Sequence, residues 1–376
     1  MTNGELPKNP FESIANPEEE AKQIQAIADL TKAHLDRRYK SQGEKPLRGV
    51  HPKSHGCVKA YFDVRHDIPA DLRVGLFAEP GRRYAAWLRY SNAAVLVGPD
   101  RENGKNDSRG LAIKVLDVDG DVLLEDGRAR SQDFLMINTP AFAFANVEDY
   151  LRLNQILHEK NDDPTFFFAP LQVEVPGITP QQKARILKSF QLVQQIQQIS
   201  TANPMEIQYF SAAPFLYGPD RVMKFSAIPW GGEKLPQTPT EPVSDNYLRE
   251  ALIERMGSKE DVCLDFAVQV RGPGGDLGIE DATTVWDEAE VPFRNVATIT
   301  IPAPQKAIES PRRRAACENL VFTPWHCLAE HQPLGGINRL RKAVYLASKS
   351  HRGAKHGGRG RGARGKAAGS KAAGRR

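Results

Sequence analysis

Three separated segments each place a chemically capable side chain among residues that favour β-strands. They are Arg48-Gly-Val-His51, Leu88-Arg-Tyr-Ser91 and Asp133-Phe-Leu-Met-Ile-Asn138. An imidazole with a pKa near 6.5 can accept a proton and return it at neutral pH. A nearby hydroxyl can orient that ring, and an amide can stabilise developing charge by hydrogen bonding. Each segment therefore offers one polar side chain that could take part in such chemistry.

A fourth segment, Arg341-Lys-Ala-Val-Tyr345, has a spacing that suits a helix. Residues four apart lie on the same helical face, so the guanidinium of Arg341 and the phenol of Tyr345 point the same way. A neighbouring cation favours the phenolate of a tyrosine, whose ordinary pKa is near 10. The alternative is a surface helix that carries one amphipathic tyrosine.

Alternating and β-branched runs predict the elements that position these groups. Eight strands are expected between Gly56 and Ile301, at VKAYFDV, AAWLRYS, LAIKVLDV, DFLMINT, MEIQYFSA, VMKFSAI, CLDFAVQV and VATITI. Helices are expected at 17–40, 147–159, 179–201, 245–256 and 336–351. Gly120 and Gly218 are typical of turns between antiparallel neighbours. The class is therefore α+β, with a barrel or sandwich of antiparallel strands.

In their order along the chain, these motifs resemble the catalase superfamily over residues 48–352. The matching pieces are RGVH, YFDV, LRYSN, SRGLAIKV, INTPAFAF, VPFRNVATITIP, ENLVFTP and RKAVY. The chain is most similar to the smaller catalase-like haem proteins. This resemblance implies an antiparallel eight-stranded β-barrel with surrounding helices, a haem b cofactor, and hydrogen peroxide or an organic hydroperoxide as substrate. It also implies that no NADPH is bound, because the C-terminal flavodoxin-like extension has no counterpart here.

On the distal side, the resemblance implies that His51 is the catalytic base, that Ser91 orients it and that Asn138 hydrogen-bonds a peroxide oxygen. His55 is a rival for the distal position, because HPKSHG departs from the family pattern after the first histidine. His51 and His55 could also bind zinc, but Pro52 interrupts a helix and no third ligand has a suitable spacing.

On the proximal side, the resemblance implies that Tyr345 ligates the haem iron as a phenolate, which Arg341 supports. Further cofactor contacts match the family: Arg48, Arg89 and Arg352 for the propionates, and Val50, Phe142 and Phe144 for the pocket wall. Ala143 replaces an aromatic residue of the family, and this change predicts wider substrate access. Peroxidase-like turnover with an unidentified electron donor is therefore preferred to efficient dismutation.

The charge of the chain is divided unevenly. The 376 residues include 51 Lys and Arg against 46 Asp and Glu, and residues 353–376 contain eight of the basic residues and no acidic one. That Gly-rich segment has no large apolar residue, so we expect a disordered tail, with weak polyanion binding as one possible role. The expected divisions are a helical arm at 1–47, a haem-binding domain at 48–352 and the basic tail at 353–376.

The sequence lacks the features of a membrane protein, of a secreted protein and of a zinc-binding or disulfide-rich protein. No apolar run reaches the roughly 20 residues of a membrane helix, and no secretory signal is visible, so a cytoplasmic location is expected. The four cysteines have no CxxC spacing and are expected to be free thiols, mostly buried.

Two other functions remain open: a non-catalytic haem-binding or haem-sensing protein, and an allene-oxide-type enzyme that rearranges hydroperoxides. A homo-oligomer is a further possibility.

Overall fold

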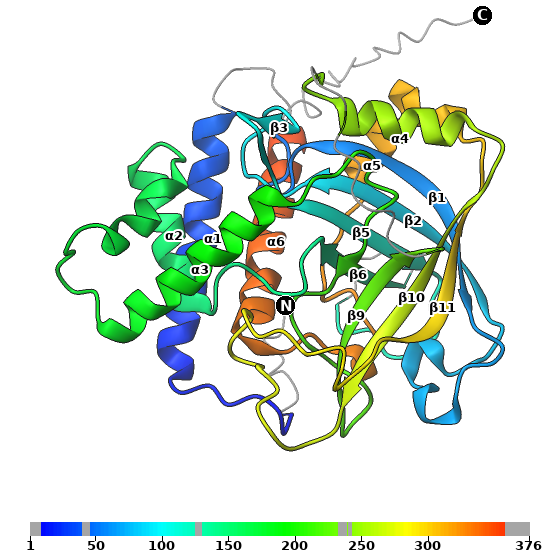
Figure 1. Ribbon diagram of the computed structural model, residues 1–376, viewed down its shortest axis with the longest axis horizontal. Helices are drawn as coiled ribbons and strands as arrows, with labels where there is room; N and C mark the ends of the chain where they lie inside the picture. Colours follow the sequence, from blue (N-terminus) through cyan, green and yellow to red (C-terminus); the bar gives the residue numbers. More distant parts are fainter. Residues whose placement is uncertain (1–8, 40–45, 125–129, 232–238, 240–242, 358–376) are drawn as a thin grey trace, which may run out of the picture.

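The computed structural model describes residues 9–39, 46–124, 130–231, 239 and 243–357. Eight antiparallel strands form a closed barrel in the order β10-β11-β1-β2-β5-β6-β7-β9, and pairing of β9 with β10 completes the circle (Figure 1). Closure leaves the barrel without a free sheet edge. The barrel strands are β1 (Ser54–Val64), β2 (Arg83–Asn92), β5 (Arg109–Leu116), β6 (Ser131–Ile137), β7 (Tyr209–Phe210), β9 (Val222–Pro229), β10 (Val262–Arg271) and β11 (Arg294–Ile301). The predicted α+β class and the eight-stranded antiparallel barrel are confirmed.

Three short strands supplement the barrel. β8 (Phe215–Leu216) pairs with β9, and β3 (Arg101–Glu102) pairs with β4 (Lys105–Asn106) in a separate hairpin. Of the predicted strand MEIQYFSA, only the two residues of β7 pair in the sheet. Ala212 has a φ of 58°, a left-handed conformation that ends the extended run.

Aromatic side chains fill the inside of the barrel. Phe134 lies at the centre, with its ring centroid 4.6 Å from that of Phe266 and 5.0 Å from that of Phe225. Residues of one face of β5, such as Ile113 and Val115, belong to this core. Because side chains alternate along a strand, Gly110 and Ala112 face outward. A site that uses these two residues therefore lies outside the packed barrel.

Six α-helices surround the barrel, and all five predicted helices are present. The six are α1 (Pro17–Arg38), α2 (Val147–Glu159), α3 (Pro180–Gln198), α4 (Tyr247–Gly257), α5 (Pro311–Asn319) and α6 (Gly335–Gly357). Four of the five match the predicted bounds within three residues, and α6 continues six residues beyond its predicted end. Short 3₁₀ helices are η1 (Ala70–Leu72), η2 (Gly75–Phe77), η3 (Pro164–Leu171), η4 (Lys306–Glu309) and η5 (Ala329–His331). Of the six, α5 was not predicted, because PRRRAACEN has no apolar periodicity.

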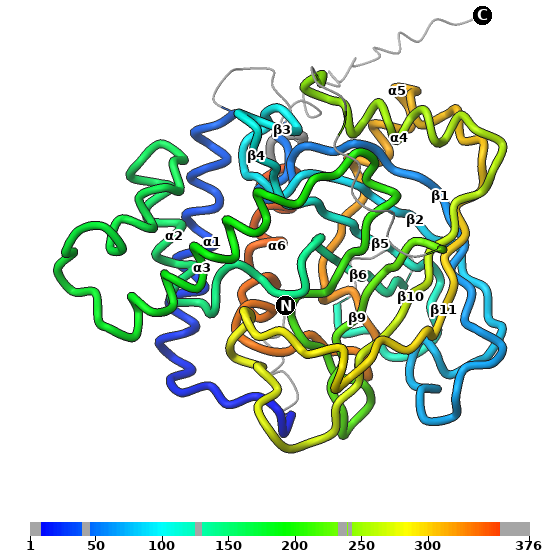
Figure 2. Tube along the Cα trace, viewed as in Figure 1, coloured from blue at the N-terminus to red at the C-terminus, as the bar shows by residue number. Residues whose placement is uncertain are grey.

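Helices α1, α2, α3 and α6 gather on one side of the barrel, whereas α4 and α5 pack against β1 (Figure 2). The guanidinium of Arg339 fixes α6 to the N-terminal segment, with Nε 2.6 Å from Oε1 of Glu20. The same side chain lies 2.7 Å from Oε2 of Glu280. These ion pairs hold α6 at a defined position beside the barrel.

The prediction for the cysteines needs correction, and most of the predicted C-terminal tail lies outside the described residues. Cys57 and Cys317 form a disulfide, so the prediction of free thiols is wrong for this pair. β1 and α5 meet in space although the two cysteines are 260 residues apart, and sequence spacing cannot show this. Cys263 and Cys327 are free. Helix α6 continues through Gly357, and the rest of the predicted tail lies outside the described residues.

Within the described ranges, no helix combines the length and apolar character that a membrane span needs.

Candidate active site

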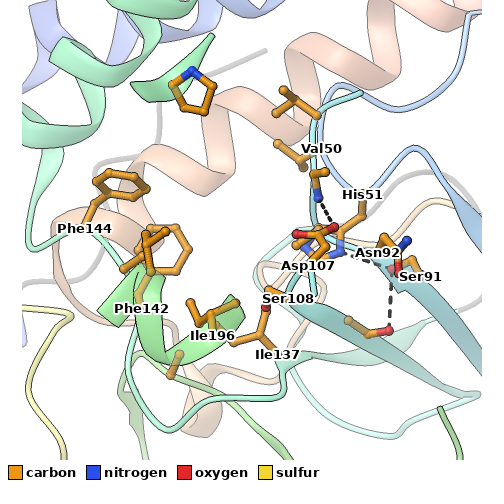
Figure 3. A pocket seen from close by; sticks show the side chains of 18 of the residues that line it. Val50, His51, Ser91, Asn92, Asp107, Ser108, Ile137, Phe142, Phe144 and Ile196 are labelled. Carbon is orange, nitrogen blue, oxygen red and sulfur yellow. Dashed lines mark hydrogen bonds between the residues drawn. The ribbon is translucent and has the colours of Figure 1, made fainter. Parts of the chain in front are cut away.

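A cavity of about 1000 Å³ adjoins the outer barrel wall and helices α2, α3 and α6. Ten of the eleven site residues expected from the sequence line it. They are Arg48, Val50, His51, Arg89, Ser91, Phe142, Phe144, Arg341, Tyr345 and Arg352. Figure 3 shows His51 and Ser91 on one side and Phe142 and Phe144 on the other. Segments about 300 residues apart thus contribute to one cavity.

His51 is placed by an unusual backbone conformation and two hydrogen bonds. Its φ is 53°, a value that few residues other than glycine adopt. Its Nδ1 lies 3.1 Å from Oγ of Ser91, and its carbonyl accepts a 2.9 Å bond from Nη2 of Arg89. The hydroxyl of Ser91 donates to the carbonyl of Gly110, so it accepts from Nδ1–H of His51. This arrangement leaves Nε2 as the proton acceptor.

The environment of His51 keeps its imidazole neutral. Burial lowers the pKa of His51 to about 3, and the positive charges of Arg89 and Arg341 act in the same direction. A neutral ring is the form that can take a proton from a bound molecule.

Gly110 makes room for the histidine ring and was not expected from the sequence. A Cβ atom at this position would lie 2.5 Å from Nδ1 of His51 and 2.9 Å from Oγ of Ser91. The sequence signal was a glycine inside a strand, which often marks the close approach of another group.

Asn138 is the one expected site residue that does not line the cavity. Its Oδ1 accepts bonds from Oγ of Ser108, at 3.1 Å, and from the backbone N–H of Arg109, at 2.8 Å. Its Nδ2 is buried and has no hydrogen-bond partner among the described residues. Ser108, which is hydrogen-bonded to Asn138, and Ile137, which precedes it in the chain, do line the cavity. The amide therefore has a free donor close to the cavity wall.

His55 belongs to a buried polar network instead of the cavity lining. Its Nε2 lies 2.9 Å from Oδ1 of Asn92, whose Nδ2 donates to Asp100 at 2.9 Å. Arg109 donates to the same Asn92 oxygen at 2.7 Å. Burial lowers the pKa of His55 to about 4. His51 is therefore the histidine that faces the cavity, and the described residues contain no His, Cys, Asp and Glu cluster of the kind that holds a zinc ion.

Tyr345 and Arg341 extend from α6 into the cavity lining. The guanidinium carbon of Arg341 lies 5.7 Å from the ring centroid of Tyr345. Its Nη1 donates to Oδ1 of Asn338 at 3.0 Å. Because Nδ2 of Asn338 donates to the carbonyls of Pro214 and Leu334, its oxygen must face the guanidinium. Asn338 therefore orients Arg341, and the sequence analysis did not single it out.

Three arginines form a cationic end of the cavity. Burial lowers the pKa of Arg89 to about 9 and that of Arg352 to about 10, and the charge of Arg48 contributes to both shifts. The Nε atoms of Arg89 and Arg352 are buried without a hydrogen-bond partner among the described residues. Unpaired guanidinium donors beside one another suit a ligand that carries carboxylates.

The remaining lining is largely apolar. Phe142 has its ring centroid 6.1 Å from that of Phe144 and 6.0 Å from that of Tyr150. The cavity extends past these rings to Phe168 of η3 and Phe190 of α3. The cavity thus has an apolar region beside its cationic end.

Comparison with known proteins gives partial sequence matches. No family model matches the chain. A peroxisomal catalase from Toxoplasma gondii is 30% identical over 132 residues, which are 35% of this chain and 22% of that protein. Catalase C from Rhizobium meliloti (strain 1021) is 27% identical over 127 residues, or 34% of this chain and 16% of the relative. The matched segments thus span less than a quarter of these relatives.

Solved structures extend the likeness to nearly the whole chain. A bacterial catalase superposes with a TM-score of 0.58 at 17% identity, over 92% of this chain and 64% of that one. Catalase A from Saccharomyces cerevisiae gives a TM-score of 0.60 at 17% identity, over 94% and 68% of the two chains. The fold is that of catalases, and with the sequence matches it supports a relationship between this chain and the catalase superfamily.

Proposed function

We propose that the chain is a haem-dependent oxidoreductase that metabolises peroxides. The observation that carries the proposal is the convergence on one cavity of a neutral histidine, a tyrosine beside an arginine, and three further arginines. The relatives named above are catalases, and the chain shares their fold.

The residues present fit haem b. Tyr345 would provide a phenolate ligand for the iron, and the positive charge of Arg341 would stabilise that phenolate. Arg48, Arg89 and Arg352 would pair with the two propionates, for which the unpaired Nε atoms supply donors. When bound, ferric haem supplies the centre at which the O–O bond of a peroxide is broken.

His51, Ser91 and Asn138 would act on the peroxide, through proton transfer and hydrogen bonding. Nε2 of His51 would accept the proton from one peroxide oxygen and return it to the departing oxygen. Ser91 keeps Nδ1 protonated and the ring oriented, because its Oγ accepts the Nδ1–H bond. The free Nδ2 of Asn138 would donate to a peroxide oxygen as negative charge develops. Phe142 and Phe144 would limit the entry of bulk water.

An absorption spectrum tests this function. Purified protein is titrated with ferric haem, and hydrogen peroxide and a lipid hydroperoxide are then added in separate samples. We expect stoichiometric binding with a Soret band and consumption of at least one peroxide at a rate above that of free haem. A protein that stays colourless, or a bound haem that consumes neither peroxide, contradicts the proposal.

The apolar extension of the cavity favours organic hydroperoxides as a second candidate substrate class. Phe168 and Phe190 lie where a chain longer than hydrogen peroxide would extend. Peroxidase turnover of such a substrate would yield an alcohol and an oxidised donor, whereas an allene-oxide-type rearrangement would need no donor. Product analysis by mass spectrometry, with and without a reducing donor, distinguishes the two reactions.

A further inference from the structure

The C-terminal end of α5 is the point at which the arginines of the cationic end meet. Arg48 donates from Nη2 to the carbonyls of Cys317, at 3.1 Å, and Leu320, at 2.7 Å. Its Nη1 donates to Oε2 of Glu318 at 2.6 Å. Arg352 donates to the carbonyl of Glu318 at 3.4 Å, and Nη2 of Arg89 lies 3.8 Å from Oε1 of Glu318. All three arginines thus contact the segment 317–320.

A disulfide attaches this segment to the barrel. Cys317 is bonded to Cys57 of β1, and Cys57 is the direct cross-strand partner of Arg89 in β2. Within α5, Cys317 is the buried residue, whereas most of the helix is exposed. A nine-residue helix with so little buried apolar surface has weak support from packing. The covalent bond therefore fixes the end of α5 relative to the strand that carries Arg89.

The net charge at the cationic end of the cavity is opposite to that of a ligand with two negative charges. The carboxylate of Glu318 contacts the guanidiniums of Arg48 and Arg89, and its backbone carbonyl accepts from Arg352. The four side chains together carry a net charge of +2. Like charges close together oppose one another, and the pKa of Arg48 is lowered by burial while Glu318 acts against that shift. Glu318 thus favours the charged form of all three arginines, of which Arg48 and Arg89 are buried.

We propose that Glu318 is a positioning residue for this arginine cluster, and that the Cys57–Cys317 disulfide holds it in place. The two features together set the affinity for a cofactor that carries two carboxylates. This inference rests on the proposed function, because haem is the ligand whose propionates the arginines would bind. Glu318 acts through the arginines and has no part in the reaction itself.

The test compares two porphyrins, ferric haem and its dimethyl ester, in which both carboxylates are masked. The variants are the double substitution Cys57→Ser/Cys317→Ser, Glu318→Ala and Glu318→Gln. Loss of a charge-assisted contact reduces affinity on the order of tenfold, so haem should dissociate about tenfold more readily from the double variant and from Glu318→Ala. Binding of the dimethyl ester should be unchanged, and Glu318→Gln, which can still accept from Arg48, should recover part of the loss.

Two control variants match these changes. Cys263→Ser removes a free thiol of β10, and Glu309→Ala removes an exposed carboxylate of η4 just before α5. Both should bind haem like the wild-type protein. Peptide mapping without reductant should recover Cys57 and Cys317 in one linked pair.

The outcomes separate this inference from the function on which it rests. Failure of the wild-type protein to bind either porphyrin refutes the proposed function. Normal haem binding by the wild-type protein with unchanged or tighter binding by Glu318→Ala overturns the positioning role alone. An equal loss for both porphyrins also overturns it, because a general structural defect would not distinguish free from masked carboxylates. Recovery of Cys57 and Cys317 as free thiols overturns the role of the disulfide.

Discussion

At the scale of single residues, the cavity separates a neutral proton acceptor from a cation-supported phenol. Nδ1–H of His51 donates to the hydroxyl of Ser91, which leaves Nε2 as the proton acceptor of the neutral ring. Tyr345 instead lies under the guanidinium of Arg341, which Asn338 holds in place. The two side chains thus have the contrasting surroundings on which their proposed roles, proton transfer for His51 and iron ligation for Tyr345, depend.

Replacement of His51 by Ala should lower peroxide consumption by the haem-loaded protein about 10²- to 10⁴-fold, the usual contribution of a positioned general base. Haem affinity should change little, since the imidazole is not the proposed ligand. The exposed His66 provides the control, and His66→Ala should keep full turnover. Unchanged turnover in His51→Ala would favour a non-catalytic haem-binding or haem-sensing protein instead.

Peroxide turnover by the haem-loaded protein should persist to an unusually low pH. The pKa of His51 is lowered from 6.5 to about 3, so the neutral form persists as the pH falls through 6 and 5. Turnover that needs this form should stay level down to about pH 4 and decline as the pH approaches 3. Initial rates across this range, with the Soret band recorded to detect cofactor loss, measure the effect. If half of the turnover were lost near pH 6.5 with haem still bound, burial would not lower the pKa of His51.

Gly110→Ala should impair catalysis without a change at the proximal side. The new Cβ would meet Nδ1 of His51 at 2.5 Å, so the ring must move away from Ser91. We expect turnover to fall at least tenfold while the Soret position is retained, because a small misplacement of a catalytic group is costly. Gly98→Ala is the matched control, since its Cβ would meet nothing within 4 Å. Equal turnover rates for Gly110→Ala and Gly98→Ala would contradict the close packing of His51 against Gly110.

At the scale of elements, local sequence patterns predicted most of the fold. Helix α2 begins at Val147 and ends at Glu159 as expected, since Asn146 caps an amphipathic run. The eight strands alternate or are rich in β-branched residues, and all are present. Helix α5 was not predicted, because PRRRAACEN has no apolar periodicity and the disulfide that attaches it to β1 joins residues 260 positions apart. β7 was predicted too long, because the conformation of Ala212 is not visible in the residue pattern.

The disulfide between β1 and α5 should contribute to stability as well as to cofactor affinity. It closes a loop of 260 residues, and removal of a native disulfide costs about 2 to 5 kcal/mol in small domains. Cys57→Ser/Cys317→Ser should therefore lower the free energy of unfolding of the cofactor-free protein by about that amount. Urea denaturation followed by circular dichroism measures this difference, with Cys263→Ser as the control. An unchanged midpoint and slope would show that the bond adds nothing to stability.

At the scale of the whole molecule, the site is built by bringing together segments from both halves of the chain. The order of short motifs was enough to indicate ten of the residues that line the cavity. It did not indicate Asn92, Arg109 or Glu318, because their hydrogen bonds join positions that only the folded chain brings together. It also did not indicate Asn338, which lies three residues before Arg341 on α6 but is held in place by the distant carbonyl of Pro214. It placed Asn138 at the cavity, whereas the structure puts its side chain in the wall.

The most direct test of the proposed site is the spectrum of Tyr345→Phe after reconstitution with ferric haem. Phenylalanine keeps the ring that packs near Arg341 but removes the oxygen that would ligate the iron. The wild-type protein should show the Soret band and electron paramagnetic resonance signal of a ferric phenolate complex. In the variant, both should change, and haem should dissociate faster. A Soret band and ligand field identical to those of the wild-type protein would contradict ligation by Tyr345.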